Sequence, residues 1–397
     1  MAEAYDPFGR ETLDDPFPAY AELRAECPVH RYHGFDPAFF TLSRYTDVAD
    51  ALRDVPTYSS IHGQGPRWTA QGGLFTDPPQ HTAFRRLLQK AFTPRAVARM
   101  EPFVSSMADE LVAAVAGDGR GDLHDALAAP LPTIAIATML GVPSADRRRF
   151  KAWSDAMVAS MGSQDPLAFR TERAELEAYL LEHIDHRRSL AAGGAELPDD
   201  LISALVRAED EGATLTPSEI MGSIVQLLVG GNETTTSLIT NALVRLMERP
   251  ALLAQVATDL RLVDAVVEES LRFDAPVLGL FRTTTCPVVL HGVEMPAEAK
   301  VMLLYGSANR DADAFAEPDE FRLDRPAAET RRHLAFGTGV HFCLGAALAR
   351  LEARHALRAA IGGLPGLRPA GPAARITPFL LWGRRTLPVA WDIPATD

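Results

Sequence analysis

The chain contains few cysteines and no recognisable export signal. Its cysteines, Cys27, Cys286 and Cys343, stand far apart in 397 residues, so they do not form the disulfide framework of a small secreted domain. The N-terminus lacks both the basic segment and the apolar segment of a secretory signal peptide. These absences predict a cytoplasmic protein of a reducing compartment.

Positive charge is scarce as well. The sequence has 39 Lys and Arg against 52 Asp and Glu, a formal net charge of -13, which argues against nucleic acid or an anionic membrane surface as the partner. One uncharged stretch, residues 126–145, is long enough to suggest a membrane span. Pro130, Pro132 and Pro143 interrupt it and alanines dilute its hydropathy, so we expect a buried helix and no membrane anchor.

No repeat and no linker rich in proline, glycine and serine divides the chain. Hydrophobic residues make up 47% and charged residues 23%, as in ordinary soluble globular proteins. We therefore expect residues 1–397 to form one large domain.

Helical periodicity dominates the middle of the sequence. Asp77, followed by Pro78, has the pattern of a helix N-cap with proline at the first helical position. We expect helices over residues 77–92, 96–116, 122–140, 145–161, 167–190, 199–208 and 216–248. Short strand-like runs cover residues 39–42, 282–290, 300–305 and 377–382. The predicted fold class is mainly α with small β-sheets.

The most informative motif places one cysteine in a glycine-rich loop that leads into a helix: Phe336-Gly-Thr-Gly-Val-His341-Phe-Cys343-Leu-Gly345. The glycines permit tight turns and let a flat macrocycle approach the backbone. Helix-forming residues begin at Leu344, and a helix N-terminus stabilises a thiolate. We interpret Cys343 as a ligand of a haem iron; the alternative, a cysteine acting as a small hydrophobe, suits Cys27 and Cys286 better.

The long predicted helix over 216–248 has an unfavourable centre. Gly230 and Gly231 are followed by Asn232, Glu233 and three threonines, and glycine and β-branched residues lower helix propensity. We expect the Thr234 hydroxyl to bond the Gly230 carbonyl and to open a groove for water or dioxygen. The alternative is a glycine kink without a function.

The cysteine string resembles the haem-binding signature of cytochromes P450, Phe-Gly-x-Gly-x-His/Arg-x-Cys-x-Gly, at every fixed position. The resemblance implies the P450 fold, a helical body with a long central helix, and heme b (iron protoporphyrin IX) between the central and proximal helices. It implies that Cys343 is the axial thiolate, that Phe336 packs beside it, that Gly345 belongs to the haem loop and that His341 reaches a haem propionate.

The centre of the long helix resembles the family's distal motif, Ala/Gly-Gly-x-Asp/Glu-Thr. The resemblance implies that Glu233 and Thr234 supply protons during oxygen activation. Glu269 and Arg272, three residues apart, precede a segment similar to the one from which the family supplies a second arginine, here Arg325. Most such pairs are exposed and nearly neutral in energy, but the resemblance implies that these three residues form a buried structural network.

Cationic residues stand at the positions from which the family binds the haem carboxylates. His81 and Arg85 are four residues apart on one predicted helix and match the family's His-x-x-x-Arg, and Arg282 follows Pro276. With His341 they would form a cationic cradle, since arginine can hold a carboxylate with two hydrogen bonds. For His81 a purely structural role is the alternative.

The resemblance implies a soluble bacterial monooxygenase. It would use O2 to hydroxylate or otherwise oxidise a mainly hydrophobic small molecule, with electrons from a separate ferredoxin or flavodoxin and its NAD(P)H reductase. The alternatives are a peroxide-driven haem oxygenase and a non-catalytic haem-binding sensor. The Glu233 and Thr234 pair argues against both.

By the same resemblance, the substrate pocket draws on residues 61–75, 157–161, 225–230, 277–281 and 379–381. Its expected lining residues are Trp68, Leu228, Gly230, Leu278, Leu280, Phe379 and Leu380. Only His62 and Arg67 are basic in these segments, which favours a neutral substrate.

Three arginines can form a local basic patch that attracts an acidic ferredoxin, namely Arg99, Arg350 and Arg354. The alternative is that they are ordinary solvated arginines.

Overall fold

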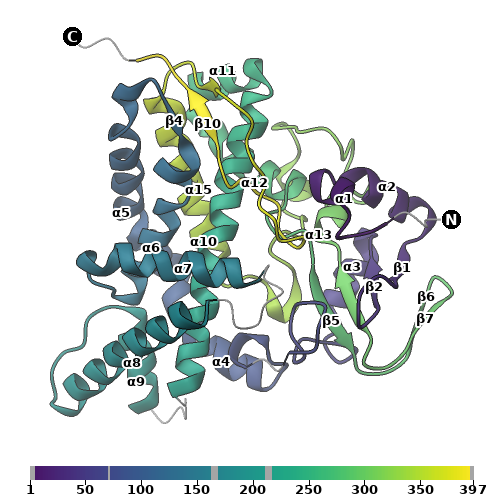
Figure 1. Ribbon diagram of the computed structural model, residues 1–397, viewed down its shortest axis with the longest axis horizontal. Helices are drawn as coiled ribbons and strands as arrows, with labels where there is room; N and C mark the ends of the chain where they lie inside the picture. Colours follow the sequence, from purple (N-terminus) through teal and green to yellow (C-terminus); the bar gives the residue numbers. More distant parts are fainter. Residues whose placement is uncertain (1–4, 70–71, 162–168, 211–216, 394–397) are drawn as a thin grey trace. The chain divides into compact units, whose positions relative to one another are not determined.

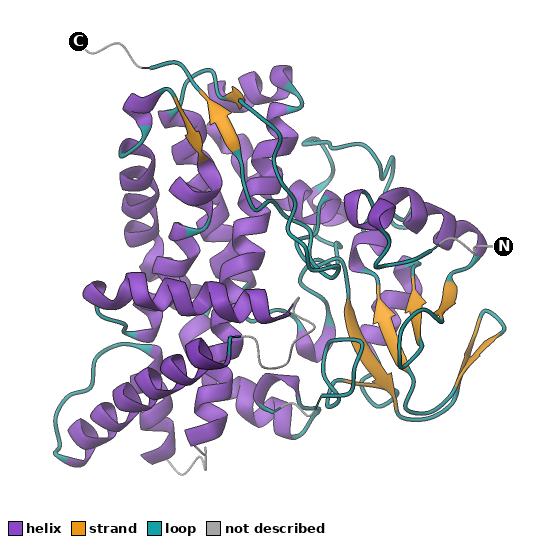
Figure 2. Cartoon of the chain, viewed as in Figure 1, coloured by secondary structure: helices purple, strands orange, loops and turns teal. Residues whose placement is uncertain are grey.

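A computed structural model describes residues 5–69, 72–161, 169–210 and 217–393. The chain divides into two compact units, and both are assembled from separated segments. Unit 1 comprises Met1–Thr82, Thr240–Cys343 and Ala373–Arg385, and unit 2 comprises Ala83–Ile239, Leu344–Pro372 and Thr386–Asp397. Helices predominate over strands (Figure 2), which confirms the predicted fold class.

Unit 2 is mainly helical. Its helices are α5 (Pro94–Ala113), α6 (Pro130–Leu140), α7 (Arg147–Met161), α8 (Arg170–Ala192), α9 (Leu201–Asp210) and α15 (Ala346–Gly363), with a π-helical turn at His124–Ala128. Helices α5 and α15 pack side by side (Figure 1). The pairing is close because Gly363 has no side chain: a Cβ there would lie 2.7 Å from the Val112 Cγ1 atom.

A small antiparallel sheet completes unit 2. Its strands follow the order β4, β10 and β9, with bounds Arg120–Asp122, Pro388–Ala390 and Arg368–Pro369. Buried aromatic and aliphatic side chains fill the helical core, among them Phe150, Trp153 and Leu180. The Trp153 indole nitrogen donates a hydrogen bond of 2.9 Å to Glu175 on α8, so its polar atom is satisfied inside the core.

Unit 1 contains a five-stranded sheet in the order β1, β2, β8, β5 and β3. The bounds are β1 Val29–Tyr32, β2 Phe39–Leu42, β3 Tyr58–Ser59, β5 Leu280–Thr284 and β8 Lys300–Leu303, and β6 (Val288–Leu290) pairs separately with β7 (Val293–Met295). Among the described strand pairs of this sheet, β2 and β8 run parallel and the others run antiparallel. Successive side chains of a strand point to opposite faces of the sheet, so the sheet contributes to two hydrophobic clusters. Phe40 and Val301 belong to one cluster, and Phe39 and Met302 belong to the other.

Unit 1 also contains short helices. They are α1 (Arg10–Asp14), α2 (Phe17–Glu26), α3 (Tyr45–Arg53), α11 (Pro250–Thr258), α12 (Val263–Phe273), α13 (Tyr305–Ala308) and α14 (Ala327–Thr330). Two further helices contain residues of both units, namely α4 (Gln80–Gln89) and the 31-residue α10 (Pro217–Met247). Single 3-10 turns occur at Gly73–Phe75, Lys90–Phe92, Ala116–Asp118, Ser144–Asp146, Leu260–Leu262 and Gly339–His341.

The predicted helices are present with shifted ends, but the start predicted at Asp77 is wrong. Helix α4 begins at Gln80. The Asp77 carboxylate instead accepts hydrogen bonds from the Ser59 hydroxyl at 2.5 Å and the Ser60 amide at 3.0 Å. The Asp77 carboxylate therefore makes tertiary hydrogen bonds, whereas the local sequence predicted that it would cap the helix.

Two strand predictions also need correction. The run 282–290 breaks after Thr284, and β6 starts only at Val288, after Pro287, which has no N–H to donate. Over residues 377–382 no strand forms; the described contact there is a single bridge between Val277 and Leu381. No helix in the described ranges has both the length and the hydropathy needed to cross a bilayer.

Candidate functional site

The cysteine loop is shaped by its glycines. The Cys343 amide donates a hydrogen bond of 2.9 Å to the Phe336 carbonyl, which closes the loop. Gly337 and Gly339 have φ of +64° and +73°, in the left-handed region that favours glycine. A Cβ at Gly339 would also lie 3.1 Å from the Leu52 carbonyl oxygen. The loop can adopt this form only with glycine at these turns.

Cys343 itself is exposed, and so are its apolar neighbours. Val340 and Phe342 are 42% and 41% exposed, respectively. Helix α15 begins at Ala346 rather than at Leu344 as predicted, with Gly345 as its N-cap residue. The thiol therefore precedes the first helical residue by three positions.

These residues fit a haem group. No described atom lies within 4 Å of the position that a Cβ would occupy at Gly337 or at Gly345, so the backbone at both glycines borders open space. An exposed thiol, exposed apolar side chains and uncovered backbone are what a flat macrocycle with a thiolate ligand requires. Phe336 is half-buried, with its ring centroid 6.2 Å from that of Phe342.

In unit 1 the structure brings together two of the predicted haem-carboxylate residues. The rings of His81 and His341 lie 4.2 Å apart. The His341 Nε2 atom lies 3.4 Å from the Ser60 hydroxyl and 3.9 Å from Asp77 Oδ1. Asp77, held by Ser59 and Ser60, thus faces this histidine, a neighbour that the sequence did not suggest.

The two predicted arginines lie on different elements. Arg282 is buried in β5 of unit 1, where its Nη1 donates 2.9 Å to the Phe281 carbonyl. Burial raises the pKa of Tyr305, and the neighbouring Arg282 partly offsets that increase. Arg85 is half-buried on α4, one turn after His81, and belongs to unit 2.

In unit 2 the predicted acid and alcohol occupy consecutive positions of α10. The Thr234 hydroxyl donates a 2.5 Å hydrogen bond to the Gly230 carbonyl, as predicted. The Oε1 atom of Glu233 is buried and makes no hydrogen bond to any described residue. Burial raises the pKa of Glu233 to about 7; the Asp155 charge adds to the increase, while Ser237 and Lys151 oppose it.

This pKa has a chemical consequence. A carboxyl group that titrates near neutral pH can both hold and release a proton at little cost, which suits a general acid or base. Asp155 and Lys151 themselves form a 2.6 Å ion pair on α7, so the proton affinity of Glu233 depends on that pair.

The sequence did not predict the buried polar contacts of two further residues of unit 2, Asn232 and Glu352. The buried Asn232 amide joins α10 to its neighbours: it accepts from the Thr133 hydroxyl on α6 at 2.9 Å and donates to Ser154 on α7 at 2.8 Å. Glu352 on α15 is buried, which raises its pKa to about 8, and the neighbouring Thr235 hydroxyl opposes the increase. An asparagine among apolar helix positions is a weak signal of burial, and nothing in sequence marks Glu352.

The three residues of the predicted network meet in unit 1. Glu269 accepts from Arg272 at 2.8 and 2.6 Å and from Arg325 at 3.0 Å. The remaining arginine donors bond backbone carbonyls, including those of Pro318 at 2.8 Å and Glu320 at 3.0 Å. All three side chains are buried, so the network fixes the segment around residues 316–320.

A second buried cluster surrounds Asp274. Its carboxylate accepts two hydrogen bonds from Arg245, at 2.5 and 2.9 Å, and one each from Arg310 and the Trp382 indole, at 3.4 and 3.0 Å. The arginines overcome the effect of burial and lower the pKa of Asp274. The partners are 29 to 108 residues distant in sequence, which explains why the sequence did not reveal the cluster.

The predicted pocket residues differ in their exposure and in the part of the structure to which they belong. Trp68 is 50% exposed and Gly230 is exposed, whereas Leu228 is buried. Leu278 lies in a hydrophobic cluster of unit 1 with Phe379 and Leu380 packed against it. Leu280 packs against the other cluster of that unit. Residues 70–71, and the side chains of 158–161 and Val229, fall outside the described part of the predicted pocket.

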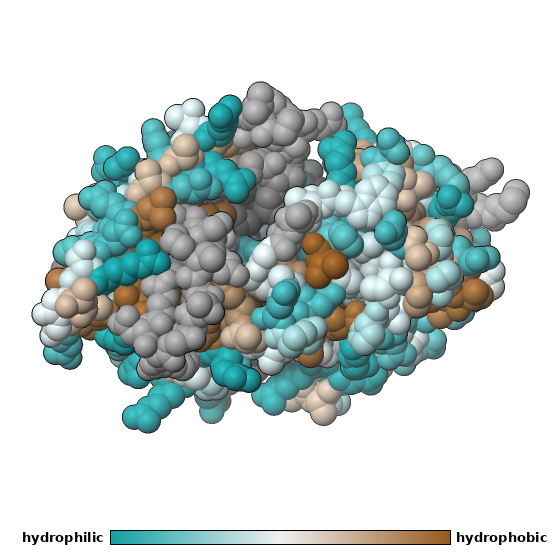
Figure 3. Space-filling view, turned by 90° about the horizontal axis from the view of Figure 1, so that it is seen from below, coloured by the Kyte–Doolittle hydropathy of each residue, from teal (hydrophilic) through white to brown (hydrophobic). Residues whose placement is uncertain are grey.

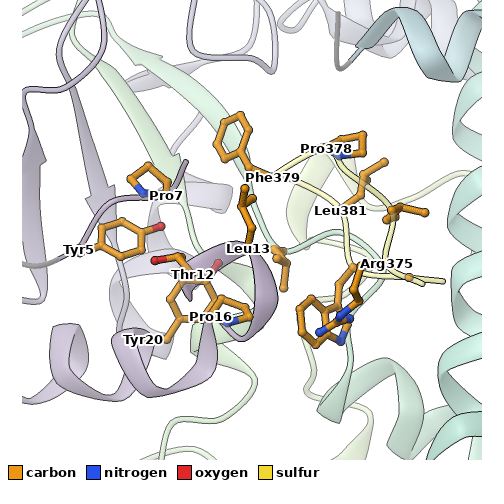
Figure 4. Close-up of a pocket in the computed structure, with 14 residues that line it drawn as sticks. Tyr5, Pro7, Thr12, Leu13, Pro16, Tyr20, Arg375, Pro378, Phe379 and Leu381 are labelled. Atoms are coloured by element: carbon orange, nitrogen blue, oxygen red, sulfur yellow. The ribbon is translucent and has the colours of Figure 1, made fainter. Parts of the chain in front are cut away.

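A small cavity lies beside Phe379, in unit 1. It is lined by residues of the N-terminal segment, including Tyr5 and Thr12, and of the segment from Arg375 to Gly383 (Figure 4). Its free volume, about 10 Å³, is enough for roughly one water molecule. This cavity is therefore too small for an organic substrate. Elsewhere, on the face in Figure 3, hydrophobic residues form separate small spots among polar ones.

A family model described as Cytochrome P450 matches residues 28–361. The chain belongs to the cytochrome P450 family. Cytochrome P450 monooxygenase PikC of Streptomyces venezuelae is 39% identical over 96% of this chain and 92% of its own. Vitamin D(3) 25-hydroxylase of Pseudonocardia autotrophica is 37% identical, over 92% and 90%, respectively.

Solved P450 structures agree with this assignment. CYP109Q5 from Chondromyces apiculatus matches with a TM-score of 0.89 at 37% identity, covering 100% of both chains. CYP109E1 from Bacillus megaterium, in complex with testosterone, matches with a TM-score of 0.85 at 34% identity, covering 96% of this chain and 100% of that one. The protein therefore has the P450 fold and is a P450 monooxygenase, an oxidoreductase whose family implies a haem cofactor.

Proposed function

We propose that this P450 binds heme b through Cys343 and hydroxylates a mainly hydrophobic small molecule. The observation that carries the proposal is the exposed Cys343 thiol on a loop that glycines shape and leave uncovered. Phe336 and Gly345 would border the macrocycle. His81, Arg85, Arg282 and His341 would bind its carboxylates.

Bound haem with a thiolate ligand supplies the reductive activation of dioxygen. The chain supplies the protons. Glu233, with a pKa of about 7, exchanges protons readily near neutral pH. Thr234 holds its hydroxyl beside the Gly230 carbonyl, where it can pass on a proton or orient water. Glu269, Arg272 and Arg325 keep the segment around 316–320 in place and take no part in the chemistry.

Exposed apolar residues support a hydrophobic substrate. Ile61 and Trp68, on the loop predicted to border the substrate, are 41% and 50% exposed. The Arg67 guanidinium lies 5.1 Å from the centre of the Phe35 ring. One of the two basic side chains of that loop is thus engaged in a contact with an aromatic ring. A relative named for vitamin D(3) hydroxylation and a similar structure that contains testosterone point the same way.

We also propose that electrons arrive from a separate ferredoxin or flavodoxin with its NAD(P)H reductase. Of the arginines expected to attract it, Arg99 lies 3.6 Å from Asp199 and Arg354 lies 3.8 Å from Glu101. These acids reduce the local positive charge, so electrostatic attraction makes a modest contribution. Salt should slow electron transfer only slightly.

The decisive test is the CO difference spectrum of the reduced protein. We expect the red-shifted band of a thiolate-ligated haem in wild type and in Cys286→Ser, a matched variant of another exposed cysteine, and its loss in Cys343→Ser. An unchanged band in Cys343→Ser would refute the ligand assignment. Spin-state titrations with testosterone and with small organic acids then test the substrate class, and tighter binding of the acids would overturn it.

A further inference from the structure

Lys300 has an unusual position for a lysine. It is the first residue of β8 and is completely buried. Its neighbours across the sheet are Phe39 on β2 and Thr283 on β5. A buried ammonium must find hydrogen-bond acceptors to offset the loss of hydration, and Lys300 finds them outside the sheet.

The acceptors are two consecutive backbone carbonyls of one loop. The Lys300 Nζ atom donates to the His62 carbonyl at 2.9 Å and to the Gly63 carbonyl at 3.0 Å. The next residue of the loop is also bound, because its carbonyl, that of Gln64, accepts from the Phe281 amide at 3.1 Å. Three successive loop carbonyls are thus attached to strands β8 and β5.

The rest of the loop depends on this attachment. The Thr69 amide donates to the His62 carbonyl at 3.0 Å, so that one carbonyl accepts from both Lys300 and Thr69 and closes residues 62–69 into a loop. The loop carries one large exposed apolar side chain, Trp68, and a second, Ile61, directly precedes it. Of its backbone contacts to the sheet, those from Lys300 are charge-assisted and therefore the strongest.

We propose that Lys300 is a positioning residue that clasps residues 62–63 to the sheet and thereby sets the affinity for bulky hydrophobic ligands. The clasp stands on the contacts described above, and its effect on affinity rests on the proposed function. Burial, together with the neighbouring charge of Arg282, lowers the pKa of Lys300 to about 8. The ammonium form still prevails at neutral pH.

Trypsin cleavage after Arg67 measures the clasp directly. Arg67 is exposed on the clasped loop, and a protease needs the chain to open locally before it can cut. Loss of the two charge-assisted bonds in Lys300→Met should speed this cleavage about tenfold or more, relative to cleavage after the exposed Arg10. If that variant does not melt cooperatively, Lys300→Gln, too short to span both carbonyls, replaces it.

A matched control separates the clasp from general loss of stability. Thr284→Val removes a buried hydroxyl of β5 that donates to the Pro296 carbonyl at 2.6 Å, and its described hydrogen-bond partners, Pro296 and Ala299, lie outside residues 62–69. It should lower the melting temperature and leave relative cleavage after Arg67 unchanged. Equal acceleration in Thr284→Val and Lys300→Met, or none in either, would overturn the clasp.

Two azoles of different size test the effect on affinity in the haem-loaded enzyme. In Lys300→Met the spectral Kd of clotrimazole should rise roughly fivefold to tenfold, because fewer molecules have the loop in its binding position. The Kd of imidazole, which is too small to need the loop, should stay the same. Equal effects on both azoles would contradict the role in affinity. Absence of the CO band in wild type would instead refute the proposed function and leave the cleavage result intact.

Discussion

Two glutamates in different units, one buried and one half-buried, show how neighbouring cations determine the role of a carboxylate. In unit 1, Glu269 is 1% exposed and accepts hydrogen bonds from two arginines. In unit 2, Glu233 is attached to no arginine among the described residues, and burial raises its pKa to about 7. The arginines hold the first carboxylate in a network that stabilises the fold, while the second titrates near neutral pH and can give up a proton.

Glu352 extends the comparison to a more extreme case. It is buried on α15, its polar contact is a threonine hydroxyl, and its pKa rises to about 8. A carboxyl group without a cation is mostly protonated when buried this deeply. The three residues therefore differ in their surroundings: two arginines hold Glu269, Glu233 titrates near neutral pH, and Glu352 is largely protonated at that pH.

The largest effect should come from breaking the pairing in unit 1. Arg272→Met leaves Glu269 with a single arginine, removes the arginine donor to the Pro318 carbonyl and leaves the Glu320 carbonyl with Arg325 alone. We expect a loss of about 3–5 kcal/mol in the free energy of unfolding, measured by urea denaturation, and poor haem incorporation. Arg261→Met, which breaks a surface pair between an exposed arginine and the partly exposed Asp259, should change little. A similar loss in both variants would contradict the buried network.

Removing the titratable acid of unit 2 should affect turnover more than stability. In Glu233→Gln the amide cannot release a proton, so product formed per electron consumed should fall about 100-fold. The pH dependence near 7 should vanish as well. The control, Asp155→Asn, removes a charge that raises the Glu233 pKa, so it should move the midpoint to lower pH without abolishing turnover. Full coupling in Glu233→Gln would exclude Glu233 from proton supply.

Replacing Glu352 by glutamine should stabilise the protein at high pH, whereas replacing Glu269 by glutamine should destabilise it. Folding raises its pKa from 4.5 to about 8, so its contribution to stability is complete below pH 4.5 and disappears as the pH rises through 8. Glu352→Gln imitates the protonated form and should stabilise the protein by on the order of 2 kcal/mol at pH 9, with almost no gain at pH 4.5. Melting curves at both pH values test this. Glu269→Gln should destabilise at both.

The smallest effect should come from the uncharged hydrogen bond between Thr133 and Asn232, the residue before Glu233. Thr133→Val removes one hydrogen bond to the Asn232 side chain, and we expect a loss of about 1 kcal/mol in unfolding free energy. The midpoint of the pH–rate profile should not move, since no charge changes. A shifted midpoint would mean that Asn232 controls the environment of Glu233 as well as helix packing.

The sequence predicted the elements whose signals are local. Apolar periodicity located the helices from α5 to α10, and consecutive residues encoded both the cysteine loop and the bond from Thr234 to Gly230. The helix start at Asp77 failed because the carboxylate binds Ser59 and Ser60. That competing contact depends on the loop and the helix meeting in space, which no local pattern records.

Contacts between distant residues account for the rest. The pair Glu269 and Arg272 is visible at a spacing of three, but the cluster around Asp274 joins residues up to 108 positions apart. Lys300 binds carbonyls 238 and 237 residues away, and in sequence it looks like any surface lysine. Burial is the main cause of the raised pKa of Glu352, and burial is a property of the assembled unit.

The segmented construction of both units bears on how the protein emerges from the ribosome. Trp382, which completes the Asp274 cluster, belongs to the last segment of unit 1, and β10 in unit 2 pairs with β4, whose residues lie more than 260 positions earlier. Neither unit can close until nearly all of the chain has been synthesised. Such long-range pairing slows folding and leaves early apolar segments exposed during translation, so we expect chaperones to bind the nascent chain.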